Sequence, residues 1–187
     1  MGKRKYQNQY RVDTWRHQNW DYSGAGVYFI TICTRNRKKY FGELISVDKS
    51  NKCYVKHSHL GKIAFKYWQD IPKHFPSVLN DAFVIMPDHV HGILILQNPK
   101  VEAQNFAPLR YRLIGNDSAN PNKFGPQSKN LASIIRGYKA GVKTYAVDNN
   151  LDFAWQRRFY DRIIRNYDEL IRIREYINSN IDNYQTA

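Results

Sequence analysis

Hydrophobic and polar positions along the chain alternate in segments that predict both strands and helices. Three segments are rich in β-branched and aromatic residues, which is typical of strands: 27–34, 81–86 and 89–96. Two further segments, 40–47 and the short 53–56, also predict strands. The Pro87-Asp88 break between the second and third long segments predicts a tight connection between antiparallel neighbours.

Apolar residues recur at helical spacing in three other segments. Ser58 predicts the N-terminal cap of a helix that Pro72 and Pro76 end. Ser128 predicts the cap of a second helix through residue 145. A last helix begins at Asn166, with acidic residues in its first turn, and runs to about residue 181. The pattern predicts an α+β domain: one antiparallel sheet with helices packed on one face.

The 187 residues suffice for one domain with a real core. We expect a basic, aromatic N-terminal arm over 1–26 and a single domain over 27–187. Residues 97–127 are rich in Asn, Pro, Gln and Gly and predict a loop insertion. The sequence has neither a long apolar run nor a secretory signal, and its two cysteines have no metal spacing. We therefore expect a cytoplasmic protein with no membrane partner.

Charge points to a polyanionic partner. Lys and Arg number 29 against 16 Asp and Glu, a net charge of +13, and 14 Tyr, 9 Phe and 4 Trp accompany them. A basic surface with aromatic rings is typical of proteins that bind single-stranded nucleic acid. The alternative is that most of the aromatic residues belong to the core and most of the Lys and Arg residues to a solvated surface. The candidate DNA contacts are Lys139 on the second helix, Arg157 and Arg158 in the basic segment 155–164, and Arg172 on the last helix.

The first candidate for chemistry is His89-Val90-His91. On a strand these two histidines point to the same face, where they could share one divalent cation, although two ordinary histidines on a half-buried strand are the alternative. His57-Ser-His59 has the same spacing but crosses a predicted helix cap, where residues two apart do not face each other. We assign no metal to that pair.

The last helix carries a second candidate. Tyr176 and Asn180 are four residues apart and share one helix face, with Arg172 one turn earlier. A phenol hydroxyl could attack phosphorus beside a cation, and an amide oxygen could complete a metal site. The alternative is that Tyr176 only packs between Ile173 and Ile177, and residue chemistry alone does not select one of fourteen tyrosines.

Four segments in order resemble a known family: YFITICTRNR (28–37), MPDHVHGILIL (86–96), LASIIRGYKAGVKTY (131–145), and WQRRFYDRIIRN with IREYINSN (155–180). They are similar to the single-tyrosine HUH transposases of the IS200/IS605 type, and more closely to the REP-associated tyrosine transposases. The resemblance implies a ferredoxin-like, RRM-like sheet. It also implies a homodimer that binds hairpin-bearing single-stranded DNA, cuts beside the hairpin, and is nucleoid-associated when bound to DNA in a bacterial cytoplasm.

The resemblance also implies roles for individual residues. His89 and His91 match the histidines that hold Mg2+ or Mn2+, Asn180 matches the third metal ligand, and Tyr176 matches the nucleophile that forms a 5′-phosphotyrosine. The family often has Asn-Pro at this point, whereas here Asn180 is followed by Ile181, which would let the helix run further. Two alternatives stay open: a non-catalytic hairpin-binding protein derived from a transposase, and a metal-dependent phosphoesterase that uses water.

Overall fold

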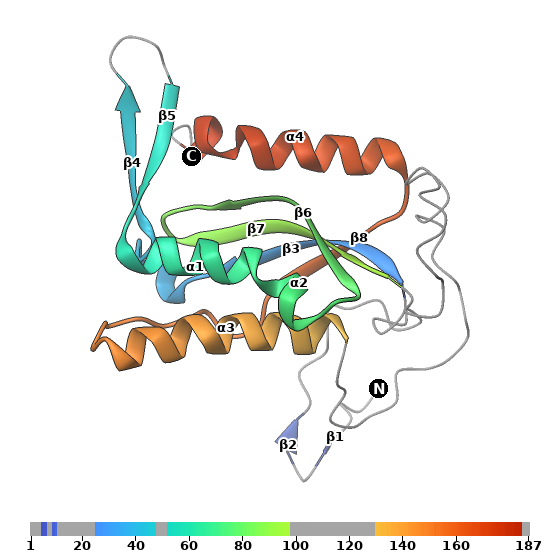
Figure 1. Ribbon diagram of the computed structural model, residues 1–187, viewed down its shortest axis with the longest axis horizontal. Helices are drawn as coiled ribbons and strands as arrows, with labels where there is room; N and C mark the ends of the chain where they lie inside the picture. The colour runs from blue at the N-terminus through green and yellow to red at the C-terminus, as the bar shows by residue number, and fades with distance from the viewer. Residues whose placement is uncertain (1–4, 7–8, 11–24, 48–51, 98–129, 185–187) are drawn as a thin grey trace.

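The computed structural model describes residues 5–6, 9–10, 25–47, 52–97 and 130–184. Its centre is a four-stranded antiparallel sheet (Figure 1). In spatial order the strands are β6 (Val78–Ile85), β7 (His89–Leu96), β3 (Gly26–Cys33) and β8 (Tyr160–Ile164). The register of β3 against β7 places Cys33 opposite His89 and Gly26 opposite Leu96.

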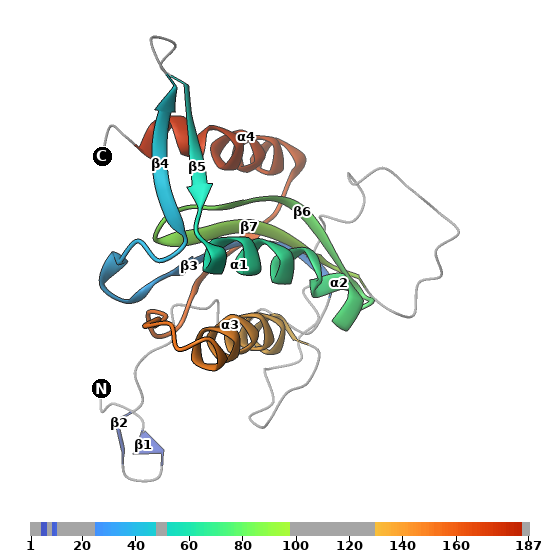
Figure 2. The ribbon, with the colours of Figure 1, turned by 60° about the vertical axis from the view of Figure 1, so that its left-hand side comes forward.

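Helices cover both faces of this sheet. One face carries α1 (His59–Gln69), α2 (Ile71–His74) and α3 (Leu131–Asp148), and the other carries α4 (Tyr167–Asn183), as Figures 1 and 2 show. The predicted α+β class is confirmed, but the helices are not confined to one face. The reason is that β7 is apolar on both sides: Leu94 packs in the cluster beneath α1 and α3, and Ile93 packs in the cluster beneath α4.

Two hydrophobic cores therefore lie on opposite sides of the sheet. The larger core includes Trp68 and Tyr138 from the helices and Tyr28 and Ile30 from β3. The smaller core is made of the buried residues Val27, Ile93, Ile95, Ile164, Leu170 and Ile177. The smaller core holds α4 against the strands that carry the histidines.

Strands β4 (Gly42–Val47) and β5 (Lys52–His57) pair with each other as a separate hairpin, so the expectation that they join the main sheet is wrong. Both edges of β3 are already occupied, by β7 on one side and β8 on the other. No edge of β3 is left for β4. A further short pair, β1 (Lys5–Tyr6) with β2 (Gln9–Tyr10), lies in the predicted arm.

Local capping signals set the helix starts. Ser58 accepts a hydrogen bond from the Gly61 amide, and Asn166 accepts one from the Glu169 amide, as predicted. The second helix is capped by Asn130, in a reciprocal pair with Ser133, rather than by Ser128, which lies outside the described residues.

The ends of the described segments bear on other predictions. Helix α4 continues past residue 181 to its end at Asn183. Most of the predicted arm and residues 98–127 of the predicted insertion lie outside the described residues. None of the helices in the described part of the chain has both the length and the apolarity needed to cross a membrane.

Candidate active site

Strand alternation brings the two histidines of β7 together. His89 and His91 both face α4, are 4% and 6% exposed, and have ring centroids 4.5 Å apart. Val90 between them is buried in the core on the opposite face. The prediction that the two imidazoles share one face of the sheet is thus confirmed.

A carboxylate orients His89. Asp88 Oδ1 lies 2.6 Å from His89 Nδ1, and Asp88 Oδ2 accepts a hydrogen bond from Arg37 Nε at 2.9 Å. Tyr184 lies near the same carboxyl group: burial, and then the negative charge of Asp88, raise the pKa of the Tyr184 hydroxyl. Burial by itself would raise the pKa of Asp88, but the hydrogen bond with His89 and the neighbouring charges outweigh it and lower that pKa. Asp88 is therefore an acceptor, so His89 Nδ1 donates to it, and in the neutral ring this leaves the lone pair on Nε2 as the position for a cation.

The turn that carries Arg37, the ion-pair partner of Asp88, has an unusual backbone conformation. Arg37 ends a short 3-10 turn, η1 (Arg35–Arg37), in which Asn36 and Arg37 have φ angles of 54° and 55°. Such left-handed residues cost energy and tend to cluster at functional sites. Here the turn delivers the Arg37 guanidinium to Asp88 beneath the histidine pair.

His91 lies between β3 and α4. Its Nδ1 is 2.9 Å from Thr31 Oγ1, its Nε2 is 3.2 Å from the Tyr176 hydroxyl, and its ring stacks on Phe29 at a centroid distance of 5.3 Å. Burial, reinforced by the charge of neighbouring His89, lowers the pKa of His91 to about 3. His91 is therefore neutral at physiological pH, which is the state in which an imidazole can bind a metal ion.

Helix α4 places Tyr176 against His91 and Tyr184 near His89, with Asn180 between them on the same helix face. The Tyr176 ring contacts His91 and meets Phe29 edge-on, yet its side chain stays 45% exposed, so a substrate can reach the hydroxyl. One turn later Asn180 is 7% exposed, and its Oδ1 has no hydrogen-bond partner among the described residues. A buried amide oxygen without a partner is costly and calls for an explanation.

The donor set fits a divalent cation. Among the described residues, no three His, Cys, Asp or Glu side chains are grouped so that they could hold a metal ion. A third donor beside His89 and His91 would therefore have to be of another type, and the Oδ1 atom of Asn180 is a candidate of that type. Two imidazole nitrogens suit Mn2+ better than Mg2+, which prefers oxygen ligands alone.

The other histidine pair has different partners. His57 Nε2 lies 2.9 Å from the carbonyl oxygen of Ile85, whereas His59 Nε2 contacts the Tyr145 hydroxyl. The two side chains are thus held by different elements, as the change from strand β5 to helix α1 between them requires.

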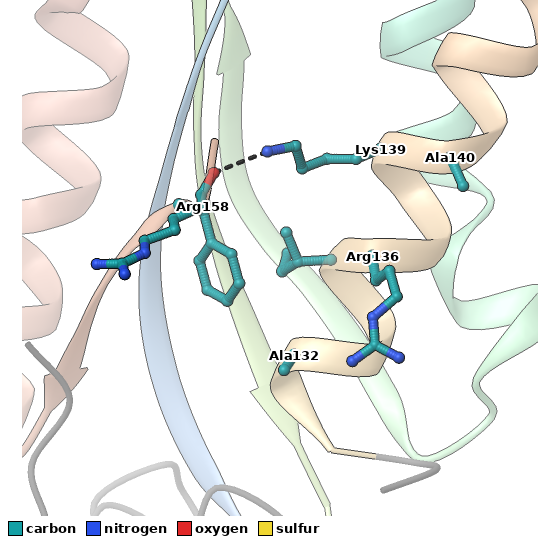
Figure 3. A pocket seen from close by; sticks show the side chains of 7 residues that line it. Ala132, Arg136, Lys139, Ala140 and Arg158 are labelled. Carbon is teal, nitrogen blue, oxygen red and sulfur yellow. Dashed lines mark hydrogen bonds between the residues drawn. The ribbon is translucent and has the colours of Figure 1, made fainter. Parts of the chain in front are cut away.

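The predicted DNA contacts lie on two sides of the molecule. Arg172 is exposed on α4, and Arg157 is exposed in the segment before β8. Lys139 and Arg158 line a pocket between α3 and that segment (Figure 3). Lys139 Nζ already donates hydrogen bonds to the carbonyl oxygens of Gln156 and Arg158 at 2.8 and 2.7 Å. It therefore supports the backbone of this segment.

Sequence reasoning missed three site residues: Arg37, Asp88 and Tyr184. Tyr184 had a detectable signal, because residues 176, 180 and 184 continue one helix face. Asp88 stands next to His89, but adjacent residues on a strand point to opposite faces. Only the turn before β7 lets Asp88 reach its neighbour's ring, and the sequence gives no sign of that.

Comparisons with known proteins give a relative and a fold. No family model matches the chain. An uncharacterized protein of Haemophilus influenzae is 36% identical over 166 residues, which cover 88% of this chain and 85% of that protein. A solved structure of a REP-associated tyrosine transposase bound to a REP hairpin aligns with a TM-score of 0.52 at 19% identity, over 90% of this chain and 72% of that one. This likeness shows the fold.

Proposed function

We propose that this chain, which belongs to the family of the Haemophilus influenzae protein and has the fold of a REP-associated tyrosine transposase, cleaves and rejoins single-stranded DNA near hairpins. One observation carries the proposal. The hydroxyl of Tyr176, on a helix, lies 3.2 Å from Nε2 of His91, in a buried pair of histidines on a strand. An accessible nucleophile beside candidate metal ligands is the arrangement that covalent phosphoryl transfer needs.

In the proposed reaction the phenolic oxygen of Tyr176 forms a bond to phosphorus, and the bond from phosphorus to the 3′ oxygen breaks. The phenolic proton passes through solvent to the released 3′ oxygen, which becomes a 3′-hydroxyl, and a 5′-phosphotyrosine remains. The phosphodiester energy is kept in the covalent bond, so the reverse attack by a 3′-hydroxyl rejoins a strand without ATP.

His89, His91 and Asn180 would hold the Mg2+ or Mn2+ ion. When bound there, the ion would polarise the scissile phosphate and offset the charge that develops on it. Asp88 and Thr31 fix the two imidazole rings through their Nδ1 atoms, which directs both Nε2 atoms away from these partners. Burial excludes water from this pair while Tyr176 stays open to substrate.

The DNA partner is supported by the net charge of +13 and by the solved structure with a similar fold, which holds a REP hairpin. The experiment is to incubate the protein with hairpin-bearing single strands from the flanks of its gene, with Mn2+, and to separate the products on a denaturing gel. We expect a covalent protein–DNA adduct and a free 3′-hydroxyl end.

Each alternative has its own result in this experiment. Hairpin binding without any cut would identify a non-catalytic binding protein. A cut without an adduct would identify a phosphoesterase that uses water, and either result would overturn the proposed strand transfer.

A further inference from the structure

A pocket of about 440 Å³ lies between α3 and the segment that leads into β8 (Figure 3). Helix α3 contributes Ala132, Ile135, Arg136, Lys139 and Ala140, and the segment contributes Arg158 and Phe159. Since α3 covers the sheet face opposite α4, this pocket is separate from the site of Tyr176 and the histidines.

Two positive charges of the pocket have no acidic partner in the part of the chain that the structure describes. Arg136 and Arg158 are both exposed, and within the described residues neither guanidinium forms an ion pair or a hydrogen bond. Three of the other described arginines are paired with acids, namely Arg37 with Asp88, Arg162 with Glu169 and Arg174 with Asp81, so what sets Arg136 and Arg158 apart from the remaining unpaired arginines is that both line one pocket. The pocket thus presents two free guanidiniums, the groups best suited to phosphate oxygens.

The backbone beneath Arg158 is strained and fixed. Arg158 has a φ of 67°, a conformation that costs energy for a residue with a side chain. The bonds from Lys139 Nζ to the carbonyls of residues 156 and 158 hold it there, as Figure 3 shows for Arg158. Trp155 Nε1 returns a bond to the Lys139 carbonyl at 3.0 Å.

The rest of the lining suits a flat apolar group. Phe159 is half-buried and gives an aromatic wall, Ile135 is buried at the helix side, and Ala132 and Ala140 leave room along α3. Charge for a phosphate and an aromatic ring for a base, side by side, are the two elements of single-strand recognition.

We propose that this pocket is a second DNA-contact site, which binds a phosphodiester of single-stranded DNA through Arg136 and Arg158 and an unpaired base through Phe159. The inference rests on the proposed function for its ligand. The additional claim is that part of the DNA binds on the face of the sheet opposite the Tyr176 hydroxyl, so that binding and cleavage of the strand take place at separate sites. Lys139 is a positioning residue here and does not itself contact the strand.

The test measures binding of a hairpin with an unpaired flank, by fluorescence anisotropy over a range of salt concentrations. The double variant Arg136→Gln, Arg158→Gln should bind more weakly, and its log–log salt slope should be smaller in magnitude by about 1.4, at about 0.7 for each lost contact. The control is Lys62→Gln with Lys66→Gln on α1, which removes the same charge from exposed positions outside the pocket. This control should bind nearly as the unchanged protein does.

Phe159→Leu tests the aromatic role, because it keeps an apolar side chain and removes the stacking face. We expect a loss of about tenfold for the flanked hairpin and little change for a blunt hairpin. If the pocket and control double variants had equal DNA affinities and equal salt slopes, the role of the pocket in DNA binding would be overturned, while the proposed function would stand. If the unchanged protein bound no hairpin and formed no adduct, the proposed function would fail, and the pocket's ligand with it.

Discussion

The Tyr176 hydroxyl and a metal ion would compete for one atom of His91. The Tyr176 hydroxyl lies against Nε2 of His91, which is the same atom that a metal ion would need. The neutral state of His91 allows it to accept either a proton donor or a cation at that nitrogen. Metal binding and this hydrogen bond are therefore alternatives, and metal binding would release the hydroxyl for attack.

Tyr176→Phe tests both roles. The ring and its contacts with Phe29 remain, so the melting temperature should stay nearly unchanged. Adduct formation should be lost, while Mn2+ affinity measured by calorimetry should be equal or higher because the competing hydroxyl is gone. Tyr167→Phe, at another exposed position on α4, is the control and should keep cleavage. An adduct on a different tyrosine in the Tyr176→Phe protein would refute the assignment.

His89→Ala and His91→Ala should each abolish cleavage and weaken Mn2+ binding, since each removes one of two nitrogen donors. Hairpin binding should persist, because it comes from the basic surface. His57→Ala is the control, as His57 contacts a backbone carbonyl elsewhere. A similar loss of Mn2+ affinity in His57→Ala would contradict the assignment of the metal to His89 and His91.

Asp88→Asn should weaken Mn2+ binding by about 10–100-fold, the usual effect of losing a group that orients a metal ligand. An amide can present its NH2 to His89 Nδ1 and so favour the wrong tautomer. Calorimetric titration with Mn2+ measures this directly, without reference to cleavage. Unchanged affinity would show that Asp88 serves only the ion pair with Arg37.

At the scale of elements, close packing of β7 on α1 holds the histidine strand in place. Gly92 follows His91 and faces the buried ring of Trp68, and a Cβ atom added there would lie 2.3 Å from Trp68 Cζ2. The glycine is thus required by the packing of α1 against the sheet. Glycine 137 in α3 has no such neighbour, since its added Cβ would meet Phe75 at 3.9 Å.

Gly92→Ala and Gly137→Ala should accordingly change the free energy of unfolding in opposite directions. We expect Gly92→Ala to lower the free energy of unfolding by about 1–3 kcal/mol through overpacking. Gly137→Ala should raise it by about 0.5–1 kcal/mol, the usual gain from replacing an exposed helical glycine. Chemical denaturation measures both. A neutral Gly92→Ala would mean that Trp68 can move away from the strand.

At the scale of the whole molecule, one chain contains all of the proposed active site. Tyr176 meets His91 of its own chain, across 85 residues of sequence. Strand β8 pairs only with β3 within the described residues, which leaves an edge where a second copy could add. We expect a homodimer, measurable by light scattering, with two independent sites.

Mixing two inactive variants tests that arrangement. Tyr176→Phe and His91→Ala, co-expressed so that mixed dimers form, should stay inactive, because neither chain has a complete site. Recovery of about a quarter to a half of the normal adduct would show that the tyrosine of one chain works with the histidines of the other.

The sequence by itself determined the local features. The bounds of β7, the shared face of His89 and His91, the caps Ser58 and Asn166, and the helical spacing of Tyr176 and Asn180 all follow from periods and caps within a few residues. The family resemblance added the roles that periodicity could not select, above all which of fourteen tyrosines to consider.

Only the tertiary structure decided what lies on which face. That β7 is apolar on both sides was visible in the sequence and indicates cover on both faces, but it does not say that α4 takes the histidine side. The meeting of Arg37 with Asp88, the exclusion of β4 from the sheet and the pocket beside Lys139 depend on contacts between distant segments. Such contacts are set by how whole elements compete for one core and for the edges of one strand, which no local pattern records.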